Sequence, residues 1–285
     1  MNESDRGEMA SPWEGISRHR FLSPHYDDIP LSCGGTVARI AASGVPPEIV
    51  VIFGSEPDPT SALSAFADAH HQQWGLNAAE VIASRQSEEA AAARILGGTP
   101  RTLPFHDAIY RDHAYTRNEQ LFGETTPGEN DLPAAIVRSL DLGDTPDPQL
   151  QLYAPLGVGC HVDHQHATRA ALRLARAGWD VWFYEDLPYA LIAGALPRRL
   201  DALTAAVNLN LAATVDVAAT WDAKISAILA YRSQIVPVFA LAGLHQPTPA
   251  AIDEVMRRYA VGRGGTTLVE VFWQVSPPTS GHRSG

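Results

Sequence analysis

The chain has 285 residues, of which 45% are hydrophobic and 19% charged, so it holds enough apolar material for a sizeable core. Its 32 acidic and 21 basic residues give a net charge of −11 without a run of Lys or Arg, which argues against nucleic acid as a partner. Two cysteines are too few for a disulfide framework, and no apolar run approaches the roughly 20 residues of a membrane helix. The polar, acidic start differs from a signal peptide, so we expect a cytoplasmic protein without a membrane partner.

Strand and helix patterns alternate along most of the chain. We expect a flexible arm at 1–17, a single domain at 18–275 and a flexible tail at 276–285. In chain order, the sequence predicts a strand at 20–22, a helix at 31–43, a strand at 48–53, a helix at 84–96, a strand at 102–104, a helix at 132–140, a strand at 150–154, a helix at 167–177, strands at 180–184 and 208–217, helices at 221–231 and 249–259, and a strand at 268–273. This alternation predicts an α/β fold of the Rossmann-like, three-layer α/β/α type with a mostly parallel central sheet.

A histidine and two adjacent carboxylates follow the first predicted strand, in the stretch SPHYDD at 23–28. Buried carboxylates are costly unless they are paired or bound to a cation, and zinc accepts both imidazole and carboxylate ligands. We expect His25 and Asp28, three positions apart in a tight turn, to bind one ion. Asp27 would then face a water molecule at that ion as the general base. The alternative is that Asp27 and Asp28 cap the following helix while His25 fills the turn.

A second cluster, HVDH at 161–164, lies in a glycine-containing turn after a later predicted strand. His164 can supply a third ligand, His161 can hydrogen-bond a developing oxyanion, and Asp163 can orient a histidine. Ligands of parallel sheets bind outside the carboxyl ends of the strands, where both clusters would lie. We therefore expect one shared site for zinc, with Fe²⁺ or another divalent metal as the alternative. The long polar stretch 109–130 is expected to border or cover the substrate cleft.

The paired motifs resemble those of a known family. PHxDD at 24–28 with the glycine pair at 34–35, together with HxDH at 161–164, is similar to the LmbE-like (PIG-L) zinc-dependent N-acetylglucosaminyl deacetylases. Further stretches typical of the family are RxxExxxA at 85–92, YEDLPY at 184–189 and KxxAxxxYxSQ at 224–234. FxDxxYR at 105–111 and HxxWG at 71–75 resemble the branch that deacetylates sugars of glycopeptide antibiotics. The resemblance covers roughly residues 20–275.

The resemblance implies a role for each matching residue. The metal ligands would be His25, Asp28 and His164. The catalytic residues would be Asp27, as base and then acid, and His161, as the oxyanion donor. Contacts to the sugar would come from Arg85 and Asp107. Many members have proline at the position of Tyr26, where the larger ring is expected to narrow or line the pocket.

Several of these residues have plainer alternatives. Arg85 could pair only with Glu88 one turn further on, and Asp107 could cap a turn. Cys160, beside the second motif, is expected to be structural because three other ligands are available. His166 is expected to face solvent on the helix that follows.

Side chains outside the motifs have open roles. Glu185 and Asp186 lie at the carboxyl end of a predicted strand and could reach the site. Trp74 and Tyr110 could stack on a sugar or an acyl chain, or pack in the core. Gln234 is expected to pack or cap.

The expected function is metal-dependent hydrolysis of an N-acetyl or longer N-acyl group on an amino sugar, in a GlcNAc-type conjugate of antibiotic biosynthesis. The partner is thus a small-molecule glycoconjugate. One alternative is deacetylation of a GlcNAc-containing thiol precursor of the mycothiol or bacillithiol type. Another is a non-catalytic, metal-containing sugar-binding protein. Asp27 and His161 argue against the latter, because a binding protein needs neither a base nor an oxyanion donor.

Overall fold

The computed structural model describes residues 12–57, 63–74, 78–111 and 114–276, and seven strands in this part form one sheet. The strands are β1 (Arg18–Ser23), β2 (Glu48–Val51), β3 (Thr99–Thr102), β4 (Leu150–Pro155), β5 (Val181–Tyr184), β6 (Leu209–Asp216) and β7 (Val269–Val275). Their order in the sheet is β3-β2-β1-β4-β5-β7-β6. The first five are parallel, and β7 runs antiparallel between β5 and β6.

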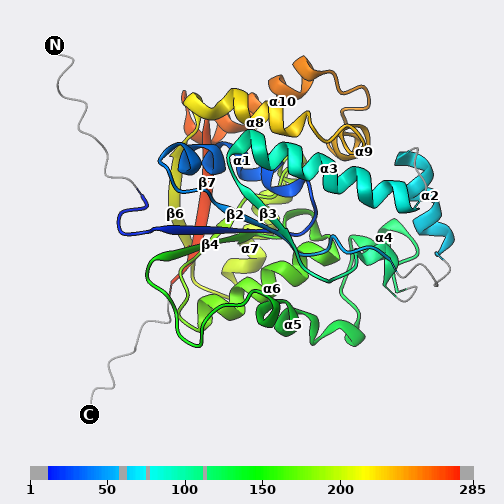
Figure 1. Ribbon diagram of the computed structural model, residues 1–285, viewed down its shortest axis with the longest axis horizontal. Coiled ribbons are helices and arrows are strands. Elements are labelled where there is room, and N and C mark those ends of the chain that lie inside the picture. The colour runs from blue at the N-terminus through cyan, green and yellow to red at the C-terminus, as the bar shows by residue number, and fades with distance from the viewer. Residues whose placement is uncertain (1–11, 58–62, 75–77, 112–113, 277–285) are drawn as a thin grey trace.

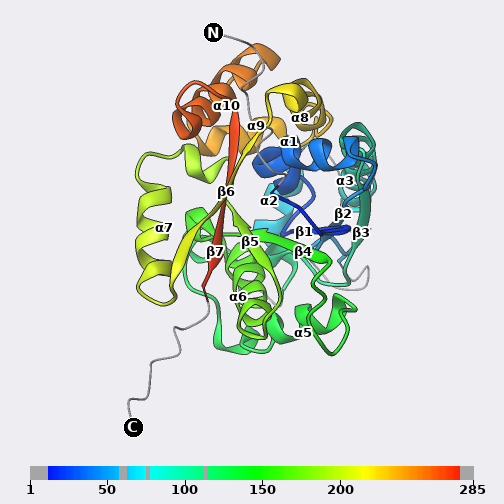
Figure 2. The same cartoon turned by 90° about the vertical axis from the view of Figure 1, so that its left-hand side faces the viewer.

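Helices cover both faces of this sheet. They are α1 (Asp28–Ala42), α2 (Ala65–Trp74), α3 (Ala78–Leu96), α4 (Asn118–Leu121), α5 (Leu132–Ser139), α6 (Val162–Arg176), α7 (Ala195–Thr204), α8 (Trp221–Ile228), α9 (Ile235–Leu241) and α10 (Pro249–Gly264). Figures 1 and 2 show α1, α3 and α8 over one face and α5 and α6 over the other. The predicted α/β fold with a mostly parallel sheet is confirmed.

The central strands are buried on both faces, as their continuous apolar sequence requires. Phe21, Leu22 and Val50 have no exposed surface, and every residue of β4 is buried. Because β1, β2 and β4 are parallel neighbours, their carboxyl ends meet at one edge of the sheet. Helices α2 and α4 lie beyond that edge, on the right in Figure 1. This edge is where a ligand site is expected.

Some boundaries differ from the predicted ones. β3, Thr99–Thr102, begins three residues before the strand predicted at 102–104. α6 begins at Val162 rather than at 167, because His161 caps the polar first turn that the Ala/Leu periodicity did not include. α2, α4, α7 and α9 were not predicted. Most of the expected arm and tail lies outside the described residues, and Trp13, near the end of the arm, packs edge-on against His19.

Helix α1 is broken near its start, at Cys33, whose φ of −141° is extended. The break frees the N–H groups of Gly35 and Thr36, which donate to the two carboxylate oxygens of Glu270 at 3.0 and 2.7 Å. Lys224 Nζ donates to the same carboxylate at 2.6 Å, so the buried charge is neutralised. Strand β7, which carries Glu270, thus holds the helix that starts at the first motif.

No helix among the described residues is long and apolar enough to cross a membrane.

The free energy of unfolding is expected to fall more steeply with decreasing pH than it would without the buried His19. This buried histidine on β1 is hydrogen-bonded to Tyr153 Oη at 3.0 Å, and burial lowers its pKa to about 4. The unfolded histidine titrates near 6.5, so the unfolded state binds the extra proton as the pH falls from 6.5 to 4. His19→Gln should reduce the loss of unfolding free energy between pH 7 and 4.5 by about 1–2 kcal/mol. Urea unfolding at both pH values measures this; equal losses in both proteins would refute it.

Candidate active site

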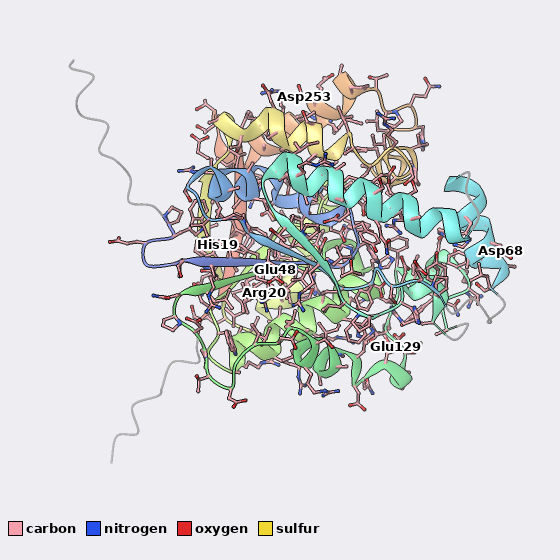
Figure 3. All side chains as sticks on the ribbon, viewed as in Figure 1. His19, Arg20, Glu48, Asp68, Glu129 and Asp253 are labelled. Atoms are coloured by element: carbon pink, nitrogen blue, oxygen red, sulfur yellow. The ribbon has the colours of Figure 1, made fainter. Side chains whose placement is uncertain are left out.

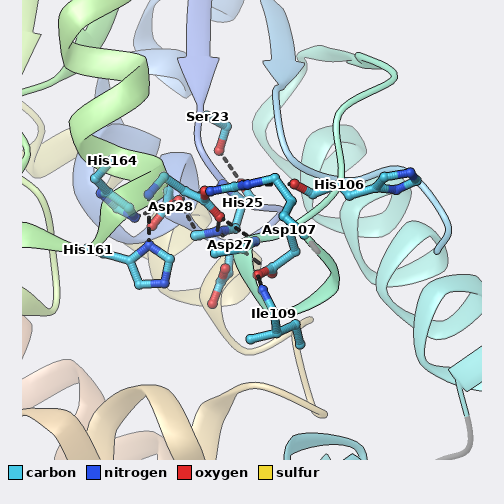
Figure 4. A network of polar contacts seen from close by, with 12 residues as sticks. Ser23, His25, Asp27, Asp28, His106, Asp107, Ile109, His161 and His164 are labelled. Atoms are coloured by element: carbon cyan, nitrogen blue, oxygen red, sulfur yellow. Dashed lines mark hydrogen bonds and ion pairs between the residues drawn. The ribbon is translucent and has the colours of Figure 1, made fainter. Parts of the chain in front are cut away.

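The first motif occupies the turn between β1 and α1, and the turn is fixed by its own polar groups. Ser23 Oγ donates to the carbonyl oxygen of His25 at 2.5 Å. The N–H of His25 donates to Asp28 Oδ2 at 2.7 Å. His25, Asp27 and Asp28 are all buried at the carboxyl edge of the sheet (Figure 4). The sequence therefore places a histidine and two carboxylates around one point through local geometry alone.

The second motif follows β4 through a short 3₁₀ turn, Val158–Cys160. Gly159 has φ +84°, and a Cβ there would lie 2.6 Å from the ring of Tyr189, so this position requires glycine. The N–H groups of Gly157 and Val158 donate to Asp186 Oδ2 at 2.9 and 3.1 Å. The turn brings His161 and His164 against the first motif (Figure 4).

Two outer carboxylates fix which nitrogen of each histidine faces the site. His25 Nε2 is 2.9 Å from Asp163 Oδ2, and His164 Nδ1 is 2.7 Å from Asp186 Oδ1. Carboxylates accept, so these nitrogens carry the protons. The other nitrogens, His25 Nδ1 and His164 Nε2, lie 3.5 and 3.3 Å from the same Asp28 Oδ2. His164 Nε2 is buried without a hydrogen-bond partner, as a nitrogen kept for a metal would be.

His161 has a different hydrogen-bond pattern. Its Nδ1 accepts from the N–H of Asp163 at 3.2 Å, at the start of α6. Burial, followed by the neighbouring His25, holds the pKa of His161 well below its usual value. A neutral ring whose Nδ1 accepts carries its proton on Nε2 and is a donor there. This is the state needed to hydrogen-bond a developing oxyanion.

The described residues therefore contain a possible His/Asp metal site. Ligand atoms of His25, His161 and His164 lie within 4.8 Å of one another, so distance alone would allow three histidines. The protonated Nε2 of His161 disfavours that set. Asp28 fits better, because its Oδ2 lies 3.5 Å from His25 Nδ1 and 3.3 Å from His164 Nε2, the imidazole nitrogens turned away from the outer carboxylates. Two imidazoles and one carboxylate form a donor set that suits zinc with an open position.

The pKa values of Asp27 and its neighbour Asp28 are shifted in opposite directions. Burial and the charge of Asp28 raise the pKa of Asp27, against the opposing effect of Arg85, whose Nη2 is 3.8 Å from Asp27 Oδ1. Burial also disfavours ionised Asp28, but His164 and His25, whose own pKa values are raised beside it, outweigh burial and hold the pKa of Asp28 far below its usual value. The protons on the imidazole nitrogens that face Asp28 are those that a bound cation would replace. Asp28 is thus a permanent anion suited to a cation, and Asp27 a carboxylate able to take up a proton.

Arg85 and Asp107 border the same space. Arg85 Nη1 lies 3.9 Å from Asp107 Oδ2, and Glu88 binds the backbone N–H and hydroxyl of Ser233 instead of pairing with Arg85. Asp107 Oδ1 caps a turn by accepting from Ile109 N–H at 3.3 Å, while Oδ2 faces His25 Nε2 at 3.7 Å. Asp107 therefore caps a turn, as the simpler interpretation predicted, and it also lies at the site.

These residues line one cleft of about 360 Å³. Its inner end is polar and contains His25, Asp27, Asp28 and His161, with Arg85 and Asp107 beside them. Its outer walls are largely apolar and come from α2, α9 and the segment 109–122, with side chains such as Phe66, Ile109, Leu121, Phe122, Val238 and Leu241. The stretch 109–130 therefore does border the cleft.

Comparisons with known proteins agree with this geometry. The sequence model of the PIG-L family, described as GlcNAc-PI de-N-acetylase, matches residues 20–175. The chain belongs to the PIG-L family. A 2'-N-acetylparomamine deacetylase of Niallia circulans is 32% identical over 59% of this chain and 66% of its own length, just under two thirds. A 1D-myo-inositol 2-acetamido-2-deoxy-alpha-D-glucopyranoside deacetylase of Nocardia farcinica is 30% identical over 75% of this chain and 79% of its own length.

A solved deacetylase of the teicoplanin biosynthesis pathway shares the fold of this PIG-L chain, with a TM-score of 0.72. It is 23% identical, and the superposition covers 92% of this chain and all of the other.

Two expectations for this PIG-L protein were wrong. His166 is fully buried, because Glu129, from a distant segment, covers this face of α6 and its Oε2 lies 3.0 Å from His166 Nε2. Tyr26 is absent from the cleft lining; its hydroxyl donates to Gly54 O at 2.6 Å and its ring lies under the Arg85 guanidinium, 5.5 Å away. Gln234 is buried, in keeping with the expected packing, and it also lines the cleft.

Of the residues whose roles the sequence left open, some contact the site and others do not. Asp186 reaches the site through His164, whereas Glu185 is bound by Arg263 at 2.7 Å and by Trp273. Cys160 is an exposed free thiol. Tyr110 is hydrogen-bonded to His71 at 2.7 Å and does not line the cleft. The side chain of Trp74 lies outside the described residues.

Sequence reasoning missed the apolar wall that α9 supplies. The run IVPVFAL at Ile235–Leu241 was the available signal, since four of its residues, Pro237, Val238, Ala240 and Leu241, line the cleft. A seven-residue apolar run containing proline has no clear period, which is why it was not assigned to a helix.

Proposed function

We propose that this protein hydrolyses the N-acetyl, or a longer N-acyl, group of an amino sugar with a divalent metal, zinc in the first place. His25, Asp28 and His164 would hold the metal. The observation that carries this proposal is that two imidazole nitrogens, left free by their outer carboxylates, face one oxygen of Asp28. Membership of the PIG-L family supports it.

A bound metal would lower the pKa of a water molecule and polarise the acyl carbonyl. Asp27, in the same cleft, takes a proton from the attacking water. The Nε2–H of His161 donates to the carbonyl oxygen as negative charge develops there. Asp27 then gives its proton to the departing amine, and acetate or a fatty acid leaves with the free amino sugar as the second product. Both proton transfers are thus assigned to Asp27.

Arg85 and Asp107 are proposed to contact the sugar, since both line the cleft beside Asp27. The proposed substrate is a GlcNAc-type conjugate of antibiotic biosynthesis, in keeping with the Niallia relative's action on 2'-N-acetylparomamine. A second candidate is a GlcNAc-containing precursor of a mycothiol-type thiol, which the Nocardia relative favours because its printed substrate joins an acetamido sugar to inositol. In either case we place the reaction in the cytoplasm.

The test is a mass-spectrometric screen of purified, zinc-loaded protein against N-acetyl amino-sugar conjugates of both kinds. We expect a loss of 42 Da, the acetyl-for-hydrogen exchange, from at least one conjugate, and its disappearance with a chelator and return with added zinc. Metal-loaded protein that binds these conjugates but deacetylates none would favour the non-catalytic sugar-binding alternative.

A further inference from the structure

Asp163 is a fully buried carboxylate directly behind His25. Its Oδ2 accepts from His25 Nε2 at 2.9 Å and from the N–H of Ala108 at 3.0 Å. Its Oδ1 accepts from Arg111 Nη1 at 2.5 Å. A buried carboxylate needs a compensating charge, and Arg111 is the guanidinium that touches it. Arg111 and His25 thus bind opposite oxygens of Asp163, so the orientation in which this carboxylate meets His25 depends on Arg111.

Arg111 is held in one orientation by groups on several sides. Its Nε donates to Glu129 Oε1 at 2.6 Å, and its Nη1 also donates to the carbonyl oxygen of His106 at 2.9 Å. The guanidinium lies over the rings of Phe53 and Tyr115, 5.1 and 5.5 Å from their centres. An arginine bound in this way offers a fixed donor to Asp163 rather than a mobile charge.

Glu129 is the outer anchor of this arrangement. It accepts from the Tyr115 hydroxyl and lies 3.0 Å from His166 Nε2, in addition to its bond with Arg111. Figure 3 shows Glu129 near the end of the molecule that carries α4. The side chains His166, Glu129, Arg111, Asp163 and His25 thus form one continuous chain of polar contacts, here called the Arg111 relay.

We propose that Arg111 is a positioning residue for the metal site, acting on His25 through Asp163, with Glu129 as its anchor. By binding Oδ1 of Asp163, Arg111 fixes the plane of that carboxylate and keeps Oδ2 in place to accept from His25 Nε2. This bond sets the orientation of the His25 ring, with Nδ1 directed toward Asp28. This inference rests on the proposed metal-binding role of His25.

Another arginine–carboxylate pair supplies the matched control. Glu185 is buried and accepts from Arg263 Nη2 and Nε at 2.7 and 3.0 Å, with a further bond from Tyr259. This pair joins α10 to the end of β5, and among the described residues Glu185 binds Tyr259, Arg263 and Trp273 rather than a histidine of the site. Arg263→Met should therefore destabilise the fold without altering metal binding.

The experiment compares full-length wild type, Arg111→Met, Arg111→Lys and Arg263→Met in metal-free form. Zinc affinity is measured by competition with a fluorescent chelator, and the tautomer of His25 by ¹⁵N NMR of the imidazole. We expect Arg111→Met to lose roughly 10- to 100-fold in zinc affinity, the usual cost of removing an outer partner of a ligand. Arg111→Lys should recover part of this, since it restores the charge but not the planar fork. Arg263→Met should stay within about threefold of wild type.

Several results would overturn the positioning role. One is Arg111→Met with wild-type zinc affinity and an unchanged His25 spectrum; another is an equal loss of affinity in Arg263→Met. Should Arg111→Met fail to fold, Glu129→Gln takes its place, with an expected loss of a few-fold. If His25→Ala binds zinc as tightly as wild type does, the proposed metal site itself is refuted. Absence of deacetylation by zinc-loaded wild type would refute only the proposed reaction, because affinity is measured without substrate.

Discussion

Asp27→Asn is expected to lower kcat by about 10²- to 10⁴-fold while the protein keeps its metal. An amide has nearly the shape of the carboxylate but cannot take a proton from water or return one to the amine. Asp27 suits this task because burial and the neighbouring Asp28 raise its pKa, whereas Arg85 keeps it ionisable. The measurement is the initial rate of acetate release by the zinc-loaded variant, with zinc content determined on the same sample.

Asp253→Asn is a suitable control for that experiment. Asp253 lies on α10, outside the cleft lining, and accepts from Trp221 Nε1 at 2.6 Å. It should retain wild-type turnover. Near-full activity in Asp27→Asn would remove Asp27 from the mechanism, and loss of zinc in that variant would make it a ligand rather than a base.

His164→Ala is expected to lose the metal. His164 is fully buried, its Nδ1 is held by Asp186, and its Nε2 is kept for the site. Its removal takes away one of three ligands, so the loss of zinc affinity should exceed the roughly 10- to 100-fold that removal of an outer partner costs. Elemental analysis after dialysis measures the zinc per chain, expected near zero in the variant.

His19→Gln is the matched control for His164→Ala. It also removes a buried histidine, but from β1, the strand whose opposite end leads into the first motif. Its zinc content should equal that of wild type. A normal zinc content in His164→Ala would refute the proposed ligand set, whatever its activity.

The sequence predicts those parts of the site that depend on neighbours in the chain. His25, Asp27 and Asp28 share one turn. The run predicted as a strand at 48–53 contains the shorter β2, Glu48–Val51, whose β-branched residues fit a sheet covered on both faces. The two motifs converge because β1 and β4 are parallel neighbours, and the alternation of strands and helices already predicts such parallel neighbours.

The partners that complete the site come from distant segments and have no local signature. Asp186 binds His164 from 22 positions away, and Glu129 binds His166 from 37. His166 was wrongly expected in solvent, because it lies two residues past His164 and so on another face of α6. A buried polar residue paired over such a distance cannot be told from an exposed one by periodicity.

The broken start of α1 has a consequence for the order of events during synthesis. The two amide groups exposed at the break are satisfied by Glu270, on the last strand of the sheet. Until that strand leaves the ribosome, the turn that carries His25 and Asp28 is joined to a helix with unmet donors. We expect a nascent chain ending before β7 to be trapped in an immature form that binds zinc poorly. Metal loading would therefore indicate that synthesis has passed β7.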